Sequence, residues 1–303
     1  MQKAYIPIQL LLTKRAVYNK YIRGKYDVNV SFLEGIITNI FASSSSSARR
    51  IAWVHNDITQ VFGKGFKSKI KAVLNKKVYS KYDKIIFVSE GNIQKFEQQY
   101  DIPTKKQVIY NYSDAEKVLQ KASEDVDLTE IGSSKIPSLL TVARLAEQKG
   151  IDRLINVHSK LIKENILHNF FIVGDGYKRK ELEEQIKRCN VIDTFKLLGS
   201  KENPYPYIKQ CDYFCLFSHF EGYPMVVVEA KILGKHISIT DNSSKEVLKN
   251  YEKSKIVENT ERGIYEGIKD LVQNKDIYLK SHQQLDYNNS KILNEIQNIL
   301  EDR

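Results

Sequence analysis

Two glutamates, Glu221 and Glu229, flank a Gly-Tyr-Pro turn that leads into an apolar run. Glycine gives such a turn conformational freedom, and proline is suited to the first position of a helix. Backbone N–H groups at a helix start attract phosphate, because they lack partners inside the helix and lie at the positive end of its dipole. We therefore expect an anion site formed by Gly222, Tyr223, Pro224 and Met225. With a carboxylate on each side, the pattern fits a nucleotide sugar: Glu221 for the sugar, the amides for the diphosphate and Glu229 for the ribose.

Two cations follow another apolar run, which predicts a strand over residues 138–143. Arg144 and Lys149 bracket the predicted turn between this strand and a helix over residues 150–164. Two fixed cations at such a turn can neutralise a departing diphosphate. In the first half of the chain, His55 follows the apolar run 51–54 and is a further candidate for a site residue.

These motifs resemble those of the retaining GT-B glycosyltransferases of family 4. The sequence from Glu221 to Ala230 reads EGYPMVVVEA, which is similar to the family pattern EGxPxxxxEA. The pairs Arg144-Leu145 and Lys149-Gly150 resemble a second hallmark, in which Arg-Leu is followed by Lys-Gly. Weaker matches are IAWVHND at 51–57, VSE at 88–90, IYN at 109–111, IVGDG at 172–176 and LLG at 197–199.

The resemblance implies that His55 and Glu221 are catalytic residues and that the donor is bound by Arg144, Lys149, Gly222, Tyr223, Pro224, Met225 and Glu229. It also implies transfer with retention, without a metal or cofactor, because the cations and the helix start supply the positive charge. In such a mechanism the acceptor hydroxyl attacks the face that the diphosphate leaves, a phosphate oxygen takes the proton, and Glu221 positions the sugar. The family's opening strand and glycine-rich loop have no match here, so we expect a shortened N-terminal domain that a partner chain or residues 1–23 would complete.

Short β-rich runs alternate with helical runs in both halves of the chain. The predicted strands cover residues 28–32, 51–54, 84–88, 107–110, 138–143, 169–173, 195–198, 213–217 and 236–239. This alternation predicts the GT-B version of the α/β class, with two doubly wound Rossmann-like domains that face a cleft. The polar stretch 113–134 is expected to be a linker. We therefore expect an incomplete acceptor-side domain over 1–133, a donor-binding domain over 134–283 and a C-terminal helix over 284–303.

The net charge of +10 is concentrated in residues 1–133, which carry 21 Lys and Arg against 13 Asp and Glu. Residues 66–79 place lysines beside apolar residues at helical spacing, which indicates either a surface helix that packs on the core or a helix that docks on an anionic membrane. Nucleic acid is not expected as a partner, because no nucleic-acid-binding motif is present. No apolar run is long enough to span a bilayer, and no secretory signal is found. Three cysteines without CxxC spacing favour a reducing cytoplasm.

The sequence thus predicts a hexosyltransferase-type enzyme that moves a sugar from a nucleotide diphosphate, UDP above all, to a saccharide or lipid-linked acceptor in surface polysaccharide synthesis. We expect it in the cytoplasm, peripherally at the inner face of the cell membrane if the basic helix docks there. Two alternatives stay open. One is a nucleotide-sugar-binding subunit that is non-catalytic or depends on a partner, and the other is a different GT-B enzyme such as a nucleotide-sugar epimerase.

Overall fold

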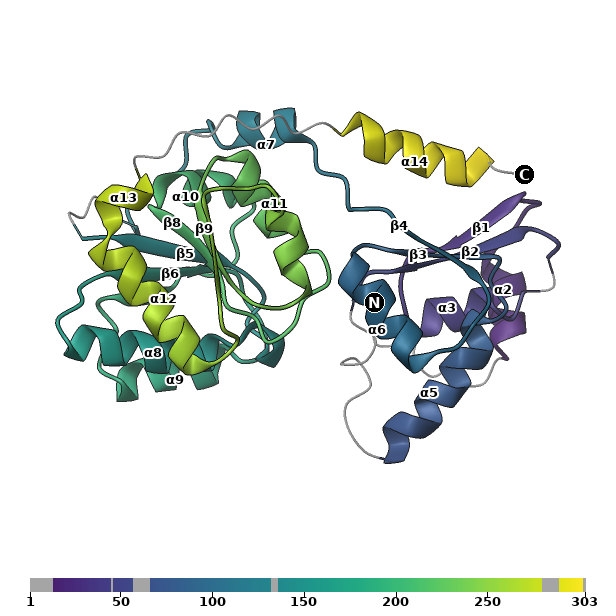
Figure 1. Ribbon diagram of the computed structural model, residues 1–303, viewed down its shortest axis with the longest axis horizontal. Helices are drawn as coiled ribbons and strands as arrows, with labels where there is room; N and C mark the ends of the chain where they lie inside the picture. The colour runs from purple at the N-terminus through teal and green to yellow at the C-terminus, as the bar shows by residue number, and fades with distance from the viewer. Residues whose placement is uncertain (1–12, 45, 57–65, 132–135, 280–288, 302–303) are drawn as a thin grey trace. The chain divides into compact units, whose positions relative to one another are not determined.

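The computed structural model describes residues 13–44, 46–56, 66–131, 136–279 and 289–301, with only the backbone described for 66–71 and 279 (Figure 1). The chain forms two compact units, Met1–Asn111 together with Ser290–Arg303, and Tyr112–Asn289. Every strand pair in both units is parallel. The predicted α/β fold class with two Rossmann-like units is confirmed.

The second unit contains a six-stranded sheet in the order β10-β9-β8-β5-β6-β7. Its strands are β5 (Ser138–Val142), β6 (Asn169–Val173), β7 (Phe195–Leu197), β8 (Tyr213–Leu216), β9 (His236–Thr240) and β10 (Ser254–Val257). The chain builds outward from β5 to β7 and then continues on the other side of β5 with β8. This reversal places a topological switch point between β5 and β8, where sheets of this kind bind ligands beyond the carboxyl ends of their strands.

Helices cover both faces of this sheet (Figure 1). One face carries α8 (Ile151–Lys163), α9 (Arg179–Arg188) and α12 (Glu261–Gln273), and α12 also contacts α13 (Lys275–Leu279). The other carries α7 (Ala115–Lys121), α10 (Tyr205–Gln210), α11 (Met225–Ile232) and the 3-10 helix η2 (Ser243–Leu248). Side chains alternate between the two faces along each strand, as Leu139 and Leu140 do on β5. Both faces are therefore buried, which explains the nearly continuous apolar runs in the sequence.

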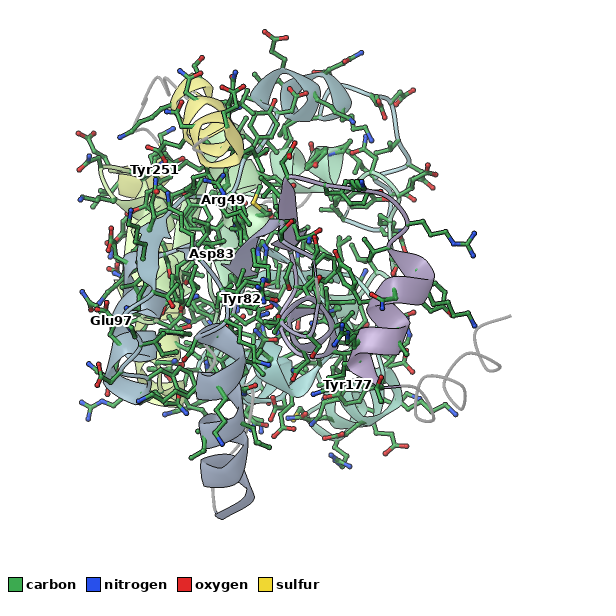
Figure 2. The ribbon with its side chains drawn as sticks, turned by 90° about the vertical axis from the view of Figure 1, so that its right-hand side faces the viewer. Arg49, Tyr82, Asp83, Glu97, Tyr177 and Tyr251 are labelled. Atoms are coloured by element: carbon green, nitrogen blue, oxygen red, sulfur yellow. The ribbon has the colours of Figure 1, made fainter. Side chains whose placement is uncertain are left out.

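In the first unit, four described strands follow chain order in the sheet, β1-β2-β3-β4. They are β1 (Val28–Ser31), β2 (Arg49–Val54), β3 (Lys84–Phe87) and β4 (Lys105–Val108). The helices are α2 (Lys14–Tyr21), α3 (Ile36–Phe41), α5 (Phe66–Tyr79), α6 (Glu90–Gln99) and α14 (Ser290–Glu301). Tyr82 and Asp83 lie together just before β3, where the Tyr82 hydroxyl donates to the carbonyl of Thr38 at 2.7 Å (Figure 2). The last helix joins this unit, because the Arg49 guanidinium contacts the carbonyl of Ile299.

The predicted linker over 113–134 is wrong in part. It contains helix α7, which is capped by Asp114 and buries Val118 in the core of the second unit. The structure accordingly divides the chain at residues 111 and 112, and not at 133 and 134. An acidic, polar segment can still form a helix when its few apolar side chains, here Val118 with Ala115, dock it on a larger core.

Candidate functional site

A cavity of about 400 Å³ lies at the carboxyl ends of β5 and β6 in the second unit. It gathers the predicted residues Arg144, Lys149, Glu221, Pro224 and Met225. The rest of its lining is Val142, Ala143, Val173, Gly174, Asp175, Ser200, Lys201, Pro204 and Val226. The switch point therefore carries a pocket in which cations, a carboxylate and a helix start occur together.

The loop after β5 positions Lys149 against Glu221. It ends in a short 3-10 helix, η1 (Glu147–Lys149), and then in Gly150, whose φ of 61° lies in the left-handed region. The Lys149 Nζ is 2.5 Å from the Glu221 Oε1, and only 14% and 8% of the two side chains is exposed. Because each charge is largely removed from water, the two ions compensate one another in the ligand-free site.

Hydrogen bonds hold the segment just before Glu221, residues 217–220, against Gln148 and Arg153. The backbone N–H of His219 donates to the carbonyl of Gln148 at 2.9 Å, and the Gln148 Nε2 donates to the carbonyl of Phe220 at 2.9 Å. Behind it, the buried Arg153 guanidinium donates to the carbonyl of Phe217 at 2.6 Å. These contacts fix the loop after β8 to the loop after β5, so Glu221 and Lys149 are held together by backbone as well as by charge.

Helix α11 begins one residue later than the sequence suggests. Pro224 is its N-cap and Met225 its first residue. Because proline has no backbone N–H, Pro224 contributes no amide to the predicted anion site. Val227 is the first residue of the helix whose N–H is bonded to the N-cap carbonyl, at 3.1 Å. Within the described part of the chain, the amides of Met225 and Val226 have no hydrogen-bond partner, and both residues line the cavity. A helix start with unpartnered amides therefore points its positive end at the pocket.

Glu229 lies one helical turn further along the same face as Met225 and Val226. The Tyr205 hydroxyl donates to the Glu229 Oε1 at 3.1 Å. Burial raises the pKa of the Glu229 carboxyl above its ordinary value, and the hydrogen bond from Tyr205 offsets part of that rise. Burial, together with the neighbouring Glu229, also raises the pKa of Tyr205 to about 12, so the phenol remains a donor at neutral pH.

The glycine-rich turn after β6 closes the floor of the site. Gly174 has a φ of 141°, and a Cβ there would lie 2.0 Å from the carbonyl oxygen of Ala143. Only glycine permits this approach between the loops after β5 and β6. Further along the chain, Tyr177 is 79% exposed, and its hydroxyl accepts from the N–H of Glu147 at 3.3 Å.

The two predicted cations differ in their surroundings. Arg144 is exposed, and its guanidinium has no ion pair or hydrogen bond within the described residues. Lys149 is mostly buried and already paired with Glu221. Lys201 also lines the cavity and is paired with Glu130. An anion that enters the cavity thus meets Arg144, which has no ion pair within the described residues, and two lysines that must exchange partners.

His55 belongs to the first unit, at the end of β2. Its backbone N–H donates to the Glu34 Oε1 at 2.5 Å. Its ring packs edge-on against the ring of Phe32, with 4.6 Å between the ring centroids. Burial lowers the pKa of His55, while Glu34 acts in the opposite direction, so the ring is neutral at pH 7. The buried Nε2 has no hydrogen-bond partner in the described part of the chain. Its predicted catalytic role stays a prediction.

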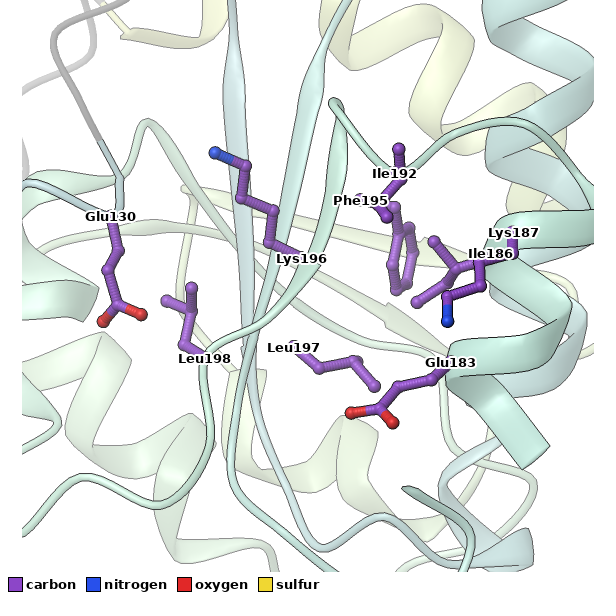
Figure 3. A pocket seen from close by; sticks show the side chains of 9 residues that line it. All are labelled: Glu130, Glu183, Ile186, Lys187, Ile192, Phe195, Lys196, Leu197 and Leu198. Carbon is purple, nitrogen blue, oxygen red and sulfur yellow. The ribbon is translucent and has the colours of Figure 1, made fainter. Parts of the chain in front are cut away.

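A second cavity of about 440 Å³ lies elsewhere in the same unit and shares no residue with the first (Figure 3). Apolar side chains of α9 and β7, among them Ile186 and Leu197, form much of its wall, and Glu130 and Lys196 stand at its edge. None of the predicted site residues lines it.

Sequence reasoning missed Tyr205, Gln148 and Arg153. Each of them acts on the site through a residue that is distant in the sequence: Tyr205 reaches Glu229 from another helix, and Arg153 reaches Phe217 from α8. The run Asn203-Pro204-Tyr205 marks a helix start, but nothing in it indicates a carboxylate partner.

Read from β7 to β10, the strand order with its reversal at β5, and the polar pocket and helix start at the switch point, are those of a doubly wound α/β protein of the Rossmann type. The family described as glycosyl transferases group 1 matches residues 130–292, more than half of the chain. The chain belongs to this family, and the resemblance inferred from the motifs is confirmed at this level.

Individual relatives agree with this assignment. The chain is 32% identical over 212 residues to the Campylobacter jejuni N-acetylgalactosamine-N,N'-diacetylbacillosaminyl-diphospho-undecaprenol 4-alpha-N-acetylgalactosaminyltransferase, covering 69% of this chain and 56% of that protein. It is 28% identical over 217 residues to an uncharacterised glycosyltransferase of Methanocaldococcus jannaschii, covering 71% of this chain and 53% of that protein. The chain thus spans about half the length of the curated relatives that it matches.

Solved structures show the same fold. Anabaena Alr3699/HepE, crystallised with UDP and glucose, matches with a TM-score of 0.69 and 17% identity over 92% of this chain and 74% of that one. The sucrose-phosphate synthase of Thermosynechococcus elongatus matches with a TM-score of 0.77 and 12% identity over 95% of this chain and 76% of that one.

Proposed function

We propose that this protein transfers a sugar from a nucleotide diphosphate, UDP in the first instance, to a saccharide or lipid-linked saccharide acceptor in polysaccharide or glycoconjugate synthesis. The observation that carries the proposal is the cavity at the switch point, where Arg144, Lys149, Glu221 and the start of α11 converge. Cations and free amides suit a diphosphate, and a carboxylate suits sugar hydroxyls.

Donor recognition has three parts, of which two lie in the cavity and the third, Glu229, lies one turn further along α11 and does not line the cavity. Arg144, Lys149 and the amides of Met225 and Val226 hold the diphosphate, Glu221 holds hydroxyls of the transferred sugar, and Glu229 holds the ribose. Gly222 and Tyr223 form the turn that presents the helix start. Charge grows on the diphosphate as it leaves, so the cations stabilise the transition state more than the ground state.

The steps of transfer are proposed from the family resemblance. The acceptor hydroxyl attacks the anomeric carbon from the side that the diphosphate leaves, with retention, and a phosphate oxygen takes its proton. Glu221 positions the sugar, His55 of the first unit acts as a neutral imidazole, and the protein's own positive groups take the place of a metal or cofactor.

Two similar proteins support the choice of ligands. A relative acts on a diphospho-undecaprenol-linked sugar, which is a lipid-linked acceptor, and a structural neighbour was crystallised with UDP and glucose. Location at a membrane surface agrees with the basic helix α5, on which Val73 and Leu74 are 60% and 56% exposed, beside Lys76 and Lys77. None of the helices in the described part of the chain is long and apolar enough to cross a membrane.

The test is release of nucleoside diphosphate from a panel of nucleotide sugars, with and without a lipid-linked saccharide. Release that requires the acceptor, with a product that keeps the anomeric configuration of the donor, supports the proposal. Binding without release would favour the non-catalytic or partner-dependent subunit. Conversion of the donor to its epimer without acceptor would favour the epimerase.

Membrane docking has its own test, sedimentation with anionic vesicles over a range of salt. Binding should fall steeply with salt and be lost when Lys67, Lys69, Lys71, Lys76 and Lys77 are replaced with Gln, because each lysine near an anionic surface contributes about 1 kcal/mol. The matched control removes the same charge from exposed positions of the second unit, Lys163, Lys180, Lys187, Lys196 and Lys249. Equal sedimentation with neutral and anionic vesicles would show α5 to be an ordinary surface helix.

A further inference from the structure

We infer that Tyr205 is a positioning residue that holds the Glu229 carboxylate toward the ribose hydroxyls of the donor and so makes the site select ribonucleotides. This inference rests on the proposed function, in which Glu229 binds the ribose. It adds a specificity-determining residue that lies outside the glutamate motif, on a different helix.

The backbone around Glu229 is rigid. Its neighbours Val228 and Ala230 are fully buried in the core on the face of the sheet that carries α7, α10 and α11. The helix therefore cannot rotate to move the carboxylate. Three and four residues earlier, Val226 and Met225 line the cavity, which places Glu229 on the same face of α11. The carboxylate therefore stands one turn beyond the diphosphate subsite, where a ribose follows the phosphates.

Tyr205 is fixed from its own side. Its N–H donates to the Asn203 Oδ1 at 3.2 Å, and the Asn203 Nδ2 donates to the carbonyl of Lys121 at 2.8 Å and to the Glu124 Oε2 at 2.7 Å. The preceding residue, Pro204, lines the cavity. The phenol thus reaches Glu229 from an anchored helix start at the pocket wall.

The hydrogen bond occupies one carboxylate oxygen and leaves the other. Tyr205 donates to Oε1, and within the described residues Oε2 has no partner. A carboxylate accepts at both oxygens, so the fixed orientation presents Oε2 and the remaining lone pair of Oε1 to two vicinal hydroxyls. A 2′-deoxynucleotide would leave one of these acceptors unsatisfied in a half-buried place, which costs affinity.

The experiment is calorimetry with UDP, ADP and GDP and with their 2′-deoxy counterparts. For the nucleotide that the wild type binds, Tyr205→Phe should weaken binding of the ribonucleotide by about 5-fold to 10-fold. This is less than the full effect of a hydrogen bond to a charged group, because Tyr205 acts on the ribose only through Glu229. Binding of the deoxynucleotide should be weakened less. The ratio of ribonucleotide to deoxynucleotide affinity should therefore fall toward the ratio measured for Glu229→Gln. Because the phenol favours the ionised carboxylate, the loss of binding on acidification should also move to higher pH in Tyr205→Phe.

Tyr207→Phe is the matched control, because the Tyr207 hydroxyl, on the same helix, donates to the carbonyl of Asp127 at 3.0 Å, away from Glu229. It should retain both the ribose preference and the pH profile of the wild type. If Glu229→Gln loses the preference while Tyr205→Phe keeps it with an unchanged pH profile, the inference is overturned and the proposed function stands. If the wild type binds none of the nucleotides, both fail together.

Discussion

Glu221 and Glu229 lie just before and within the same helix, α11, but their side chains have partners of different charge. Glu221 is paired with the buried ammonium of Lys149 at 2.5 Å, whereas Glu229 accepts a hydrogen bond from the neutral phenol of Tyr205 at 3.1 Å. The first arrangement cancels charge, and the second leaves a net negative charge that burial makes costly. Under the proposed function, this difference corresponds to two tasks. Glu221, before α11, exchanges partners when phosphate and sugar bind, and Glu229, within α11, keeps its carboxylate in a fixed orientation.

The exchange at the Glu221 end has a physical logic. Under the proposed function, Lys149 transfers from Glu221 to the diphosphate, and Glu221 is then free for sugar hydroxyls, so both charges keep a partner throughout. A free nucleoside diphosphate supplies the phosphate without the hydroxyls and leaves the Glu221 carboxylate uncompensated in a buried place. The pair therefore favours the intact donor over the product.

The largest effect is expected at this end of the helix. Lys149→Ala and Arg144→Ala should each reduce turnover by about 100-fold, and more than they reduce donor affinity, because diphosphate charge grows toward the transition state. Steady-state kinetics with separately measured donor binding would show the split. Lys163→Ala removes an exposed lysine from α8 and should leave turnover unchanged. Near-normal turnover in either of the first two variants would refute the diphosphate clamp.

Binding of the free nucleoside diphosphate and of the intact donor should distinguish the roles of the two glutamates. Glu229→Ala should weaken free nucleoside diphosphate and intact donor alike, by about 1–3 kcal/mol for a hydrogen bond to a charged group. Glu221→Ala should weaken the intact donor by a similar amount and spare the free diphosphate, since Lys149 is released for the phosphates. Calorimetry would measure the affinity of both variants for both ligands. If both variants lost the same affinity for free nucleoside diphosphate, the different roles assigned to the two glutamates would be wrong.

The sequence was informative where function depends on residues that are close along the chain. EGYPMVVVEA and the Arg-Leu and Lys-Gly pairs located the pocket, and strand-helix alternation predicted the sheet of the second unit. Contacts between distant segments could not be found in this way. Tyr205 reaches Glu229 from α10, and nothing in the spacing of either residue indicates the other. The linker was mistaken for the same reason, since the docking of Val118 depends on a core built by later residues.

Stability should change at the Glu221 end when the ion pair is broken. Glu221→Gln leaves the Lys149 ammonium 14% exposed and without its carboxylate, so the ligand-free protein should lose about 1–3 kcal/mol. Thermal unfolding would report this as a lower Tm. The control is Glu181→Gln, which breaks the surface pair with Lys178, in which the Glu181 side chain is 60% exposed, and should change the Tm little. A Tm for Glu221→Gln that equals that of the control would mean that Lys149 is solvated without its partner.

The smallest expected effect has the opposite sign and concerns Glu229. Its pKa in the folded protein is raised above the ordinary value by burial, so its ionisation favours the unfolded chain. The penalty is absent below the unfolded pKa and grows as pH rises through the folded pKa. Glu229→Gln removes the penalty, so the variant should match the wild type in Tm near pH 4 and exceed it near pH 7.

The control for this test is Glu266→Gln, which changes an exposed carboxylate on α12 and should give a Tm difference that does not vary with pH. If Glu229→Gln behaves like Glu266→Gln, the Glu229 carboxylate is not held against a cost of burial, and the contrast between the two ends of α11 loses its energetic basis. A rise in Tm that grows with pH, together with lost nucleotide binding, would mean that stability is sacrificed at Glu229 for recognition of the ribose.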